Sequence, residues 1–374
     1  MNLAALSVVR HRLQVGTPLP FNVRAADRTL LLARGQQVAD EAQLQQLFER
    51  GALVDLAELA PAPESVDHLP REALPQRWNQ CLSRMSNALR HAPHEDFQSA
   101  LDDAAGPVLA LIERDPDLAI FQILRQEGGV STAYGVRRSV NSAITAYLVA
   151  QRLAWDNEAM AKAFKVALTM NISMLDLQGE LAHQRTPPSP GQRAALQSHP
   201  LRSRQMLEAA GVHDADWLLA VTRHHEQEDG SGYPSGCTDV GDLASLARRA
   251  DIYTAKLASR NYRDALAADI AGRQIFMQDP GHPMTAALVK EFGIYPPGCY
   301  VRLASGATGI VVERGPTVTT PVVACLAGPD GAALPVPVRH DTSDPRYRVV
   351  TIVGERNVNV RITAEKLLAA TPSR

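Results

Sequence analysis

The stretch HHEQEDGSGYP, residues 224–234, joins two adjacent histidines to a turn of Gly-Ser-Gly-Tyr-Pro, which stops a helix and favours a tight loop. In the preceding GVHDADWLLAVTRHHE, Trp217, Val221, His224 and His225 fall at positions i, i+4, i+7 and i+8. This spacing forms one stripe of a helix. Both histidines are therefore predicted to extend the buried face, near the end of that helix.

Three other helices are predicted to turn a polar side chain inward. In SPGQRAALQSHP, a capping Ser189 and Pro190 start a helix that carries His199 on its apolar side. Asp251 and Asn171 continue the apolar stripes of their own helices at helical spacing. Because an isolated buried carboxylate is costly, the aspartate needs a partner, either a bound cation or a histidine. The set predicts a metal site or, alternatively, a hydrogen-bonded His/Asp network with a structural role only.

Length and composition predict a protein of two or three domains. The 374 residues are 45% hydrophobic and 21% charged, and the net charge is −2 without a basic block. These values exclude a nucleic-acid tract and a polybasic membrane anchor. The four cysteines are scattered and form no CxxC pair, which favours reduced thiols in the cytoplasm. No apolar run is long enough to span a bilayer.

Periodicity and turn residues divide the chain into four parts, and the fold class is predicted to be mainly α. A small α/β module is expected over residues 1–60, followed by a proline-rich linker and connecting helices over 61–105. Helical periodicity dominates residues 106–290, whereas 291–374 contain short β-rich runs separated by Gly, Pro and Asp.

The pattern HHExxDGxGYP, with an upstream His-Pro and a downstream Asp-Ile-Tyr, resembles the HD-GYP family over roughly residues 130–290. The resemblance implies an all-helical HD-type domain, a phosphohydrolase that cleaves cyclic di-GMP at a two- or three-metal centre. It implies metal ligands at His199, His224, His225 and Asp251, basic residues near the substrate phosphates at Arg260 and Arg263, and the family's turn at Gly232, Tyr233 and Pro234.

The chain departs from the family where the His-Asp-x-Gly-Lys run should lie. The sequence there has Met170 and Asn171 in place of the histidine and aspartate, and Met174 in place of the lysine. An earlier histidine is replaced by Arg138, or by Arg137 if the register slips by one residue. An amide is a weak ligand, a thioether suits soft Cu(I), and a guanidinium repels cations, so half of the metal centre is predicted to be lost.

Two alternatives remain open for each half of the site. The three histidines are expected to hold either one transition-metal ion (Zn, Fe or Mn) or no ion. Arg138 is expected either to form an internal ion pair with Asp251 or to bind a phosphate, in the second case together with Arg260 and Arg263.

The resulting hypothesis is a non-hydrolytic regulator of cyclic di-GMP signalling. The alternatives are a divergent metal-dependent phosphodiesterase and a helical scaffold whose function resides in the terminal modules. Expected partners are cyclic di-GMP or a related phosphoester, a diguanylate cyclase-type protein bound through the GYP turn, and a second copy of the chain, but neither nucleic acid nor membrane.

Overall fold

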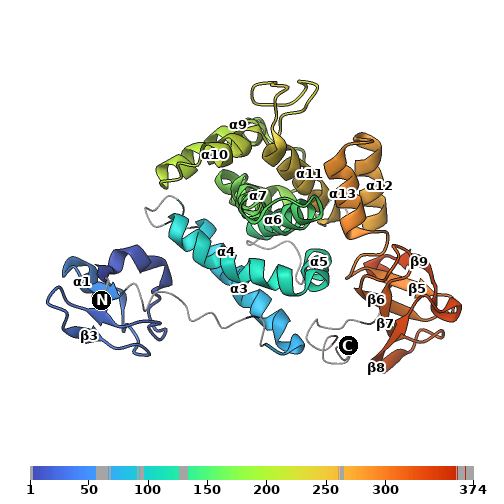
Figure 1. The fold of residues 1–374 in the computed structure, drawn as a ribbon, viewed down its shortest axis with the longest axis horizontal. Coiled ribbons are helices and arrows are strands. Elements are labelled where there is room, and N and C mark those ends of the chain that lie inside the picture. Colours follow the sequence, from blue (N-terminus) through green and yellow to red (C-terminus); the bar gives the residue numbers. More distant parts are fainter. Residues whose placement is uncertain are drawn as a thin grey trace.

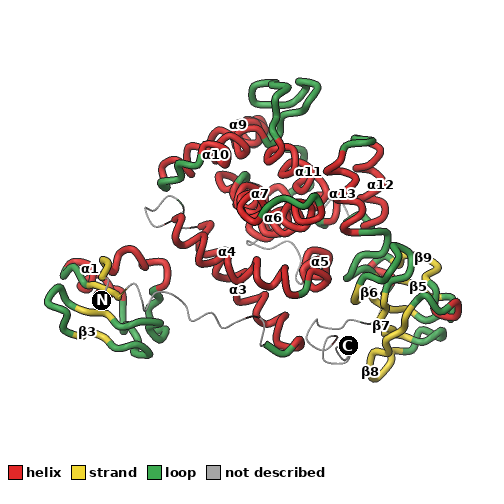
Figure 2. Tube along the Cα trace, viewed as in Figure 1, coloured by secondary structure: helices red, strands yellow, loops and turns green. Residues whose placement is uncertain are grey.

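The computed structural model describes residues 3–55, 66, 69–90, 92, 97–125, 134–259, 261, 265–358, 360 and 367. Helices fill the middle of the molecule, and the strands lie in two modules at its ends (Figures 1 and 2). The predicted fold class, a mainly helical protein with a small α/β module before it and a β-rich domain after it, is confirmed. None of the helices within the described residues combines the length and the apolarity needed to cross a bilayer.

The N-terminal module is a four-stranded antiparallel sheet with one α-helix and one 3-10 helix. Its elements are β1 (Leu3–Ala5), η1 (Leu6–Arg12), β2 (Val23–Arg24), β3 (Leu30–Leu32), α1 (Glu41–Glu49) and β4 (Leu53–Asp55). The strand order is β1-β4-β2-β3, and the module has an apolar core of its own. His11 and Arg12, at the end of η1, both contact the Asp103 carboxylate of the helical part.

The helical part packs around one apolar core. Its elements are η3 (Arg71–Ala73), α3 (Leu74–Arg90), α4 (Phe97–Arg114), α5 (Pro116–Leu124), α6 (Tyr134–Arg152), α7 (Asn157–Thr169), η4 (Ile172–Met174), α8 (Leu175–His183), α9 (Pro190–Ala209), α10 (Ala215–Arg223), α11 (Asp242–Leu257), α12 (Ala268–Gln278) and α13 (Pro283–Phe292). The predicted boundary between residues 105 and 106 falls inside α4, because apolar side chains on both sides of it enter the same core.

Helix α6 is the central element of this part, and it is buried along nearly its whole length. Gly135 lets its first turn approach α8, since a Cβ there would lie 2.1 Å from the carbonyl oxygen of Leu175. Gly135→Ala should therefore destabilise the protein by about 2 kcal/mol in chemical denaturation. Gly106→Ala is the matched control in α4, where an added Cβ meets nothing within 4 Å, and it should be neutral or stabilising. Equal effects of the two changes would contradict this role of Gly135.

The C-terminal sheet has the antiparallel order β8-β7-β6-β5-β9. Its elements are β5 (Tyr300–Leu303), β6 (Thr308–Glu313), β7 (Val322–Ala327), β8 (Ala333–Asp341), η5 (Pro345–Tyr347), β9 (Val349–Val353) and η6 (Glu355–Asn357). Arg314, just after β6, forms ion pairs with Asp117 of α5 and Glu291 of α13. Because Tyr300 and Ile310 also enter the helical core, this sheet is packed firmly onto the helices.

Candidate metal centre and the neighbouring ion pair

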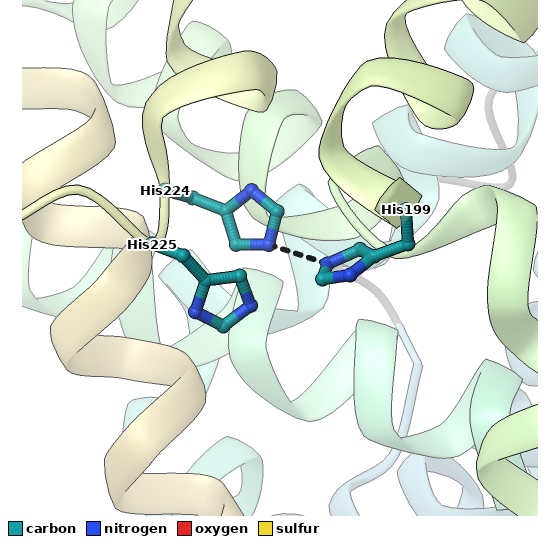
Figure 3. A group of neighbouring side chains, drawn as sticks. All are labelled: His199, His224 and His225. Atoms are coloured by element: carbon teal, nitrogen blue, oxygen red, sulfur yellow. Dashed lines mark hydrogen bonds between the residues drawn. The ribbon is translucent and has the colours of Figure 1, made fainter. Parts of the chain in front are cut away.

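Three histidines from two segments meet inside the helical part (Figure 3). His199 lies in the middle of α9, which begins with the predicted Ser189 cap, here a full capping box with Gln192. His224 and His225 follow directly after the last residue of α10, and the loop that they begin projects from the helices before α11 (Figure 1). One ligand atom from each ring can be chosen so that all three lie within 4.8 Å of one another.

The hydrogen bonds around two of these rings determine which nitrogen carries the proton. Nδ1 of His199 lies 2.6 Å from the Leu196 carbonyl oxygen, and Nδ1 of His224 lies 2.7 Å from that of Val221. A carbonyl oxygen only accepts, so each Nδ1 donates and each neutral ring keeps a lone pair on Nε2. These two Nε2 atoms are 3.0 Å apart. Two facing lone pairs repel each other, and a cation between them would remove the repulsion.

Burial keeps all three rings neutral. Desolvation, followed by the charge of a neighbouring histidine, lowers the pKa of His199, His224 and His225 to about 3 each. A neutral imidazole whose other nitrogen donates to a backbone carbonyl is the form in which histidine binds metals. The donor set, the tautomers and the spacing therefore fit one transition-metal ion with three protein ligands.

The lowered pKa values predict that metal-free protein loses stability on mild acidification. The unfolded chain binds protons near pH 6.5 and the folded cluster only near pH 3, so stability is complete above pH 6.5 and falls as the pH decreases through this window. Between pH 7 and pH 6 we expect a loss of roughly 0.7 kcal/mol per histidine. Urea unfolding in the presence of a chelator measures it. A free energy of unfolding that stays constant over this range would contradict the buried neutral cluster.

Beside the histidines, a buried arginine is paired with an aspartate. Nη2 of Arg138, from α6, lies 2.7 Å from Oδ1 of Asp251, from α11, and their side chains are only 6% and 15% exposed. Ser142 and Asn171 also reach Oδ1, each at 3.4 Å. The predicted ion pair is thus present. Arg138 is thus the arginine that pairs with Asp251, and it is buried whereas Arg137 is only half-buried.

Asp251 is not part of the histidine cluster, although the family resemblance implies that it is a fourth ligand. Its carboxylate lies near enough to His199 and His224 to raise their pKa slightly, but Oδ1 is engaged by Arg138. Met170, Asn171 and Met174 are all buried around η4. Within the described residues, Oδ1 of Asn171 has no hydrogen-bond partner, so this half of the site offers a neutral amide oxygen that is not hydrogen-bonded.

The GYP turn folds back onto the second histidine. Gly232 is required there, because a Cβ would lie 2.4 Å from Cα of Glu226 and 2.5 Å from the carbonyl oxygen of His225. The ring of Tyr233 stacks on that of His225, with centroids 4.6 Å apart and planes 14° apart. Pro234 follows through a cis peptide bond. The turn therefore covers one face of His225.

Sequence reasoning assigned no role to two acidic residues that closely follow the paired histidines, Glu226 and Glu228. The Glu226 carboxylate is fully buried and accepts hydrogen bonds from the backbone and hydroxyl of Ser235, at 2.7 and 2.6 Å. Glu228 contacts helix α11. The sequence does contain a signal for these contacts. An acidic residue next to a buried histidine in a glycine-rich loop needs hydrogen-bond donors from nearby residues. Arg260 and Arg263, the predicted phosphate contacts, lie outside the described residues.

Comparisons with known proteins agree with this architecture. Residues 129–273 match the family model described as HD domain. The chain is 27% identical over 247 residues to the cyclic di-GMP phosphodiesterase PA4108 of Pseudomonas aeruginosa, with 64% of this chain and 57% of that protein covered. It is 32% identical over 107 residues to a cyclic di-GMP phosphodiesterase of Vibrio cholerae, with 26% of this chain and 21% of that protein covered.

A solved structure shows the same fold. Bd1817, an HDG"Y"P protein from Bdellovibrio bacteriovorus, matches with a TM-score of 0.51 at 16% identity, over 77% of this chain and 98% of that one. Residues 129–273, within the helical part, therefore resemble an HD domain in sequence, and the sequence comparisons support a place in the HD-type phosphohydrolase superfamily. The chain spans little more than half the length of the curated P. aeruginosa relative.

Proposed function

We propose that this chain is an HD-domain protein of cyclic di-GMP signalling that holds one metal ion at His199, His224 and His225 and does not hydrolyse the nucleotide. The names of its relatives support the signalling role, because the two reported above are both cyclic di-GMP phosphodiesterases. The geometry of the histidines supports the metal ion, since their neutral rings converge within 4.8 Å.

The observation that carries the non-hydrolytic part is the Arg138–Asp251 ion pair. Metal-assisted phosphodiester hydrolysis at paired ions needs carboxylate oxygens that hold the two cations and lower the pKa of the water between them. Here Oδ1 of Asp251 is paired with a guanidinium at 2.7 Å, and Asn171 contributes no charge. A second cation beside Arg138 would meet a fixed positive charge in a buried setting. The residues present favour one ion rather than two.

With one ion bound, each group around the three histidines would have a distinct role. The metal would supply a Lewis-acidic position with an open fourth coordination site. The carbonyl oxygens of Leu196 and Val221 hold the protons on Nδ1 of His199 and His224, which keeps both Nε2 atoms free. The stacked ring of Tyr233 shields one face of His225 from water.

The proposed ligand and protein partners are those expected for a cyclic di-GMP signalling protein. Cyclic di-GMP remains the proposed ligand, but Arg138 is buried and paired, so phosphate recognition falls to other basic side chains, for which Arg260 and Arg263 are the candidates. The GYP turn is the proposed contact for a diguanylate cyclase-type partner, and a homodimer is the proposed assembly.

A turnover assay tests this function. Purified protein reconstituted separately with Mn, Fe and Zn should release no linear product from cyclic di-GMP, while titration calorimetry on the same samples should detect nucleotide binding. Hydrolysis that disappears in His225→Ala would overturn the proposal and establish the alternative, a divergent phosphodiesterase working with a single ion. Absence of binding heat at micromolar nucleotide would remove the receptor role.

A further inference from the structure

We propose that Arg249, acting through Glu228, is a positioning residue that holds the His224–His225 segment against helix α11. This inference rests on the proposed metal site and adds the contact that holds two of its ligands in position. Arg249 lies in α11, and its side chain is only 3% exposed. A buried guanidinium needs its donors satisfied, so its partners indicate what it holds together.

One side of the Arg249 guanidinium is bound to the connection between α12 and α13. Nε and Nη2 donate to Oδ2 of Asp279 at 2.9 and 2.5 Å, and Nε also reaches the hydroxyl of Thr285 at 3.1 Å. Asp279 is held in turn by Thr285, whose hydroxyl donates to Oδ2 at 2.8 Å. Two donors that converge on one carboxylate oxygen fix the orientation of the guanidinium plane.

The other side of the guanidinium faces the histidine loop. Nη1 of Arg249 donates to the carbonyl oxygen of Ser245 at 3.0 Å and to its hydroxyl, and it also lies 3.4 Å from Oε1 of Glu228, which accepts from the Ser245 hydroxyl at 2.8 Å. Oε2 of Glu228 accepts from Arg248 at 3.2 Å. Both carboxylate oxygens are thus held by donors from a single helix. Glu228 lies only three residues after His225, so the contact fixes the course of the chain directly beyond the cluster.

A second anchor completes the hold on this segment. Two residues before Glu228, the buried Glu226 carboxylate binds the backbone and hydroxyl of Ser235, which closes the loop on itself. The loop carrying His225 is therefore tied internally by Glu226 and externally by Glu228. Helix α11 also carries Asp251, two residues beyond Arg249. The contact between Arg249 and Glu228, called the clamp below, consequently sets the distance between the histidines and the Arg138–Asp251 pair.

The contact between Arg249 and Glu228 positions the histidine loop and contributes little to the free energy of unfolding. The Glu228 side chain is 45% exposed, so solvent screening leaves its ion pairs with little net free energy. Groups hydrogen-bonded directly to metal ligands typically change metal affinity by 10- to 100-fold, and a contact three residues from His225 is expected at the lower end of this range. Loss of the clamp should therefore weaken metal binding while leaving the fold intact.

Cobalt titration of three variants tests the proposal. Glu228→Gln keeps the shape and removes the charge, and Arg249→Lys keeps a cation beside Asp279 but loses the fork that reaches Glu228. Each should raise the dissociation constant for Co(II), read from its visible absorption, about tenfold. The double variant should be no weaker than either single one, because both act through one contact. Glu208→Gln is the matched control, since that side chain is 43% exposed and pairs with Arg204 on the surface.

Hydrogen exchange supplies a readout that needs no metal. In the metal-free protein the amides of Tyr233 and Ser235 should exchange faster in Glu228→Gln than in the wild type or in Glu208→Gln. Unchanged exchange, or Co(II) bound with wild-type affinity by Glu228→Gln, overturns the clamp. Failure of the wild type itself to bind Co(II) would instead overturn the proposed metal site, so the two failures are distinguishable.

Discussion

Replacing His224 with alanine should abolish the binding of one equivalent of Zn²⁺ or Co²⁺ that we propose for the wild-type protein. His224 is fully buried, and its Nε2 lies 3.0 Å from that of His199, so it is the central donor of the cluster. With two histidines left, a tetrahedral ion would have to take half of its ligands from solvent. Elemental analysis after reconstitution and desalting measures the bound metal directly.

The same substitution should also remove the metal-dependent part of stability. An ion that binds only the folded state adds about 2.7 kcal/mol at a free concentration 100 times its dissociation constant. Wild-type protein should therefore unfold at a higher temperature with Zn²⁺ than with a chelator, whereas His224→Ala should show no difference. His213→Ala, an exposed histidine before α10, is the matched control and should behave as the wild type. Equal metal content in His224→Ala and wild type would disprove the three-histidine site.

The histidine cluster could be predicted because its residues follow local rules. Helical periodicity placed His199 on an inner face, and the position of His224 and His225 after an apolar stripe placed both near a helix end. The structure ends α10 one residue before His224, which turns the two rings toward α9 rather than along the helix. Tyr233 of the GYP turn also folds back onto His225, a contact that periodicity does not describe.

The sequence reduces the possible partners of a buried side chain to a few alternatives, but it does not show which of them lies on a neighbouring helix. Arg138 and Asp251 are separated by 113 residues, and helical periodicity does not tell which helices pack together, so the sequence leaves both an ion pair and phosphate binding open. The Arg249 network was missed for a different reason. Acidic residues in a polar loop, such as Glu228, usually face solvent, and only the position of α11 shows that this one is held by three donors.

Replacing Arg138 with methionine should destabilise the protein by about 3–5 kcal/mol, because it leaves the carboxylate of Asp251 buried without its counter-charge. Methionine fills a similar volume, so lost packing contributes little. Chemical denaturation of metal-free protein at neutral pH measures the change. Arg346→Met is the matched control, since Arg346 is 77% exposed beside Asp344 and its removal should cost less than about 1 kcal/mol.

Two further variants separate loss of charge balance from other causes. Arg138→Met combined with Asp251→Asn should recover most of the stability, because neither charge then remains buried alone. Arg138→Met alone should gain more stability from Zn²⁺ than the wild type does, since the freed carboxylate lies near His199 and His224 and becomes available to a cation. A loss below about 1 kcal/mol in Arg138→Met, or a double variant as unstable as the single one, would show that the ion pair does not balance the charge in this half of the site.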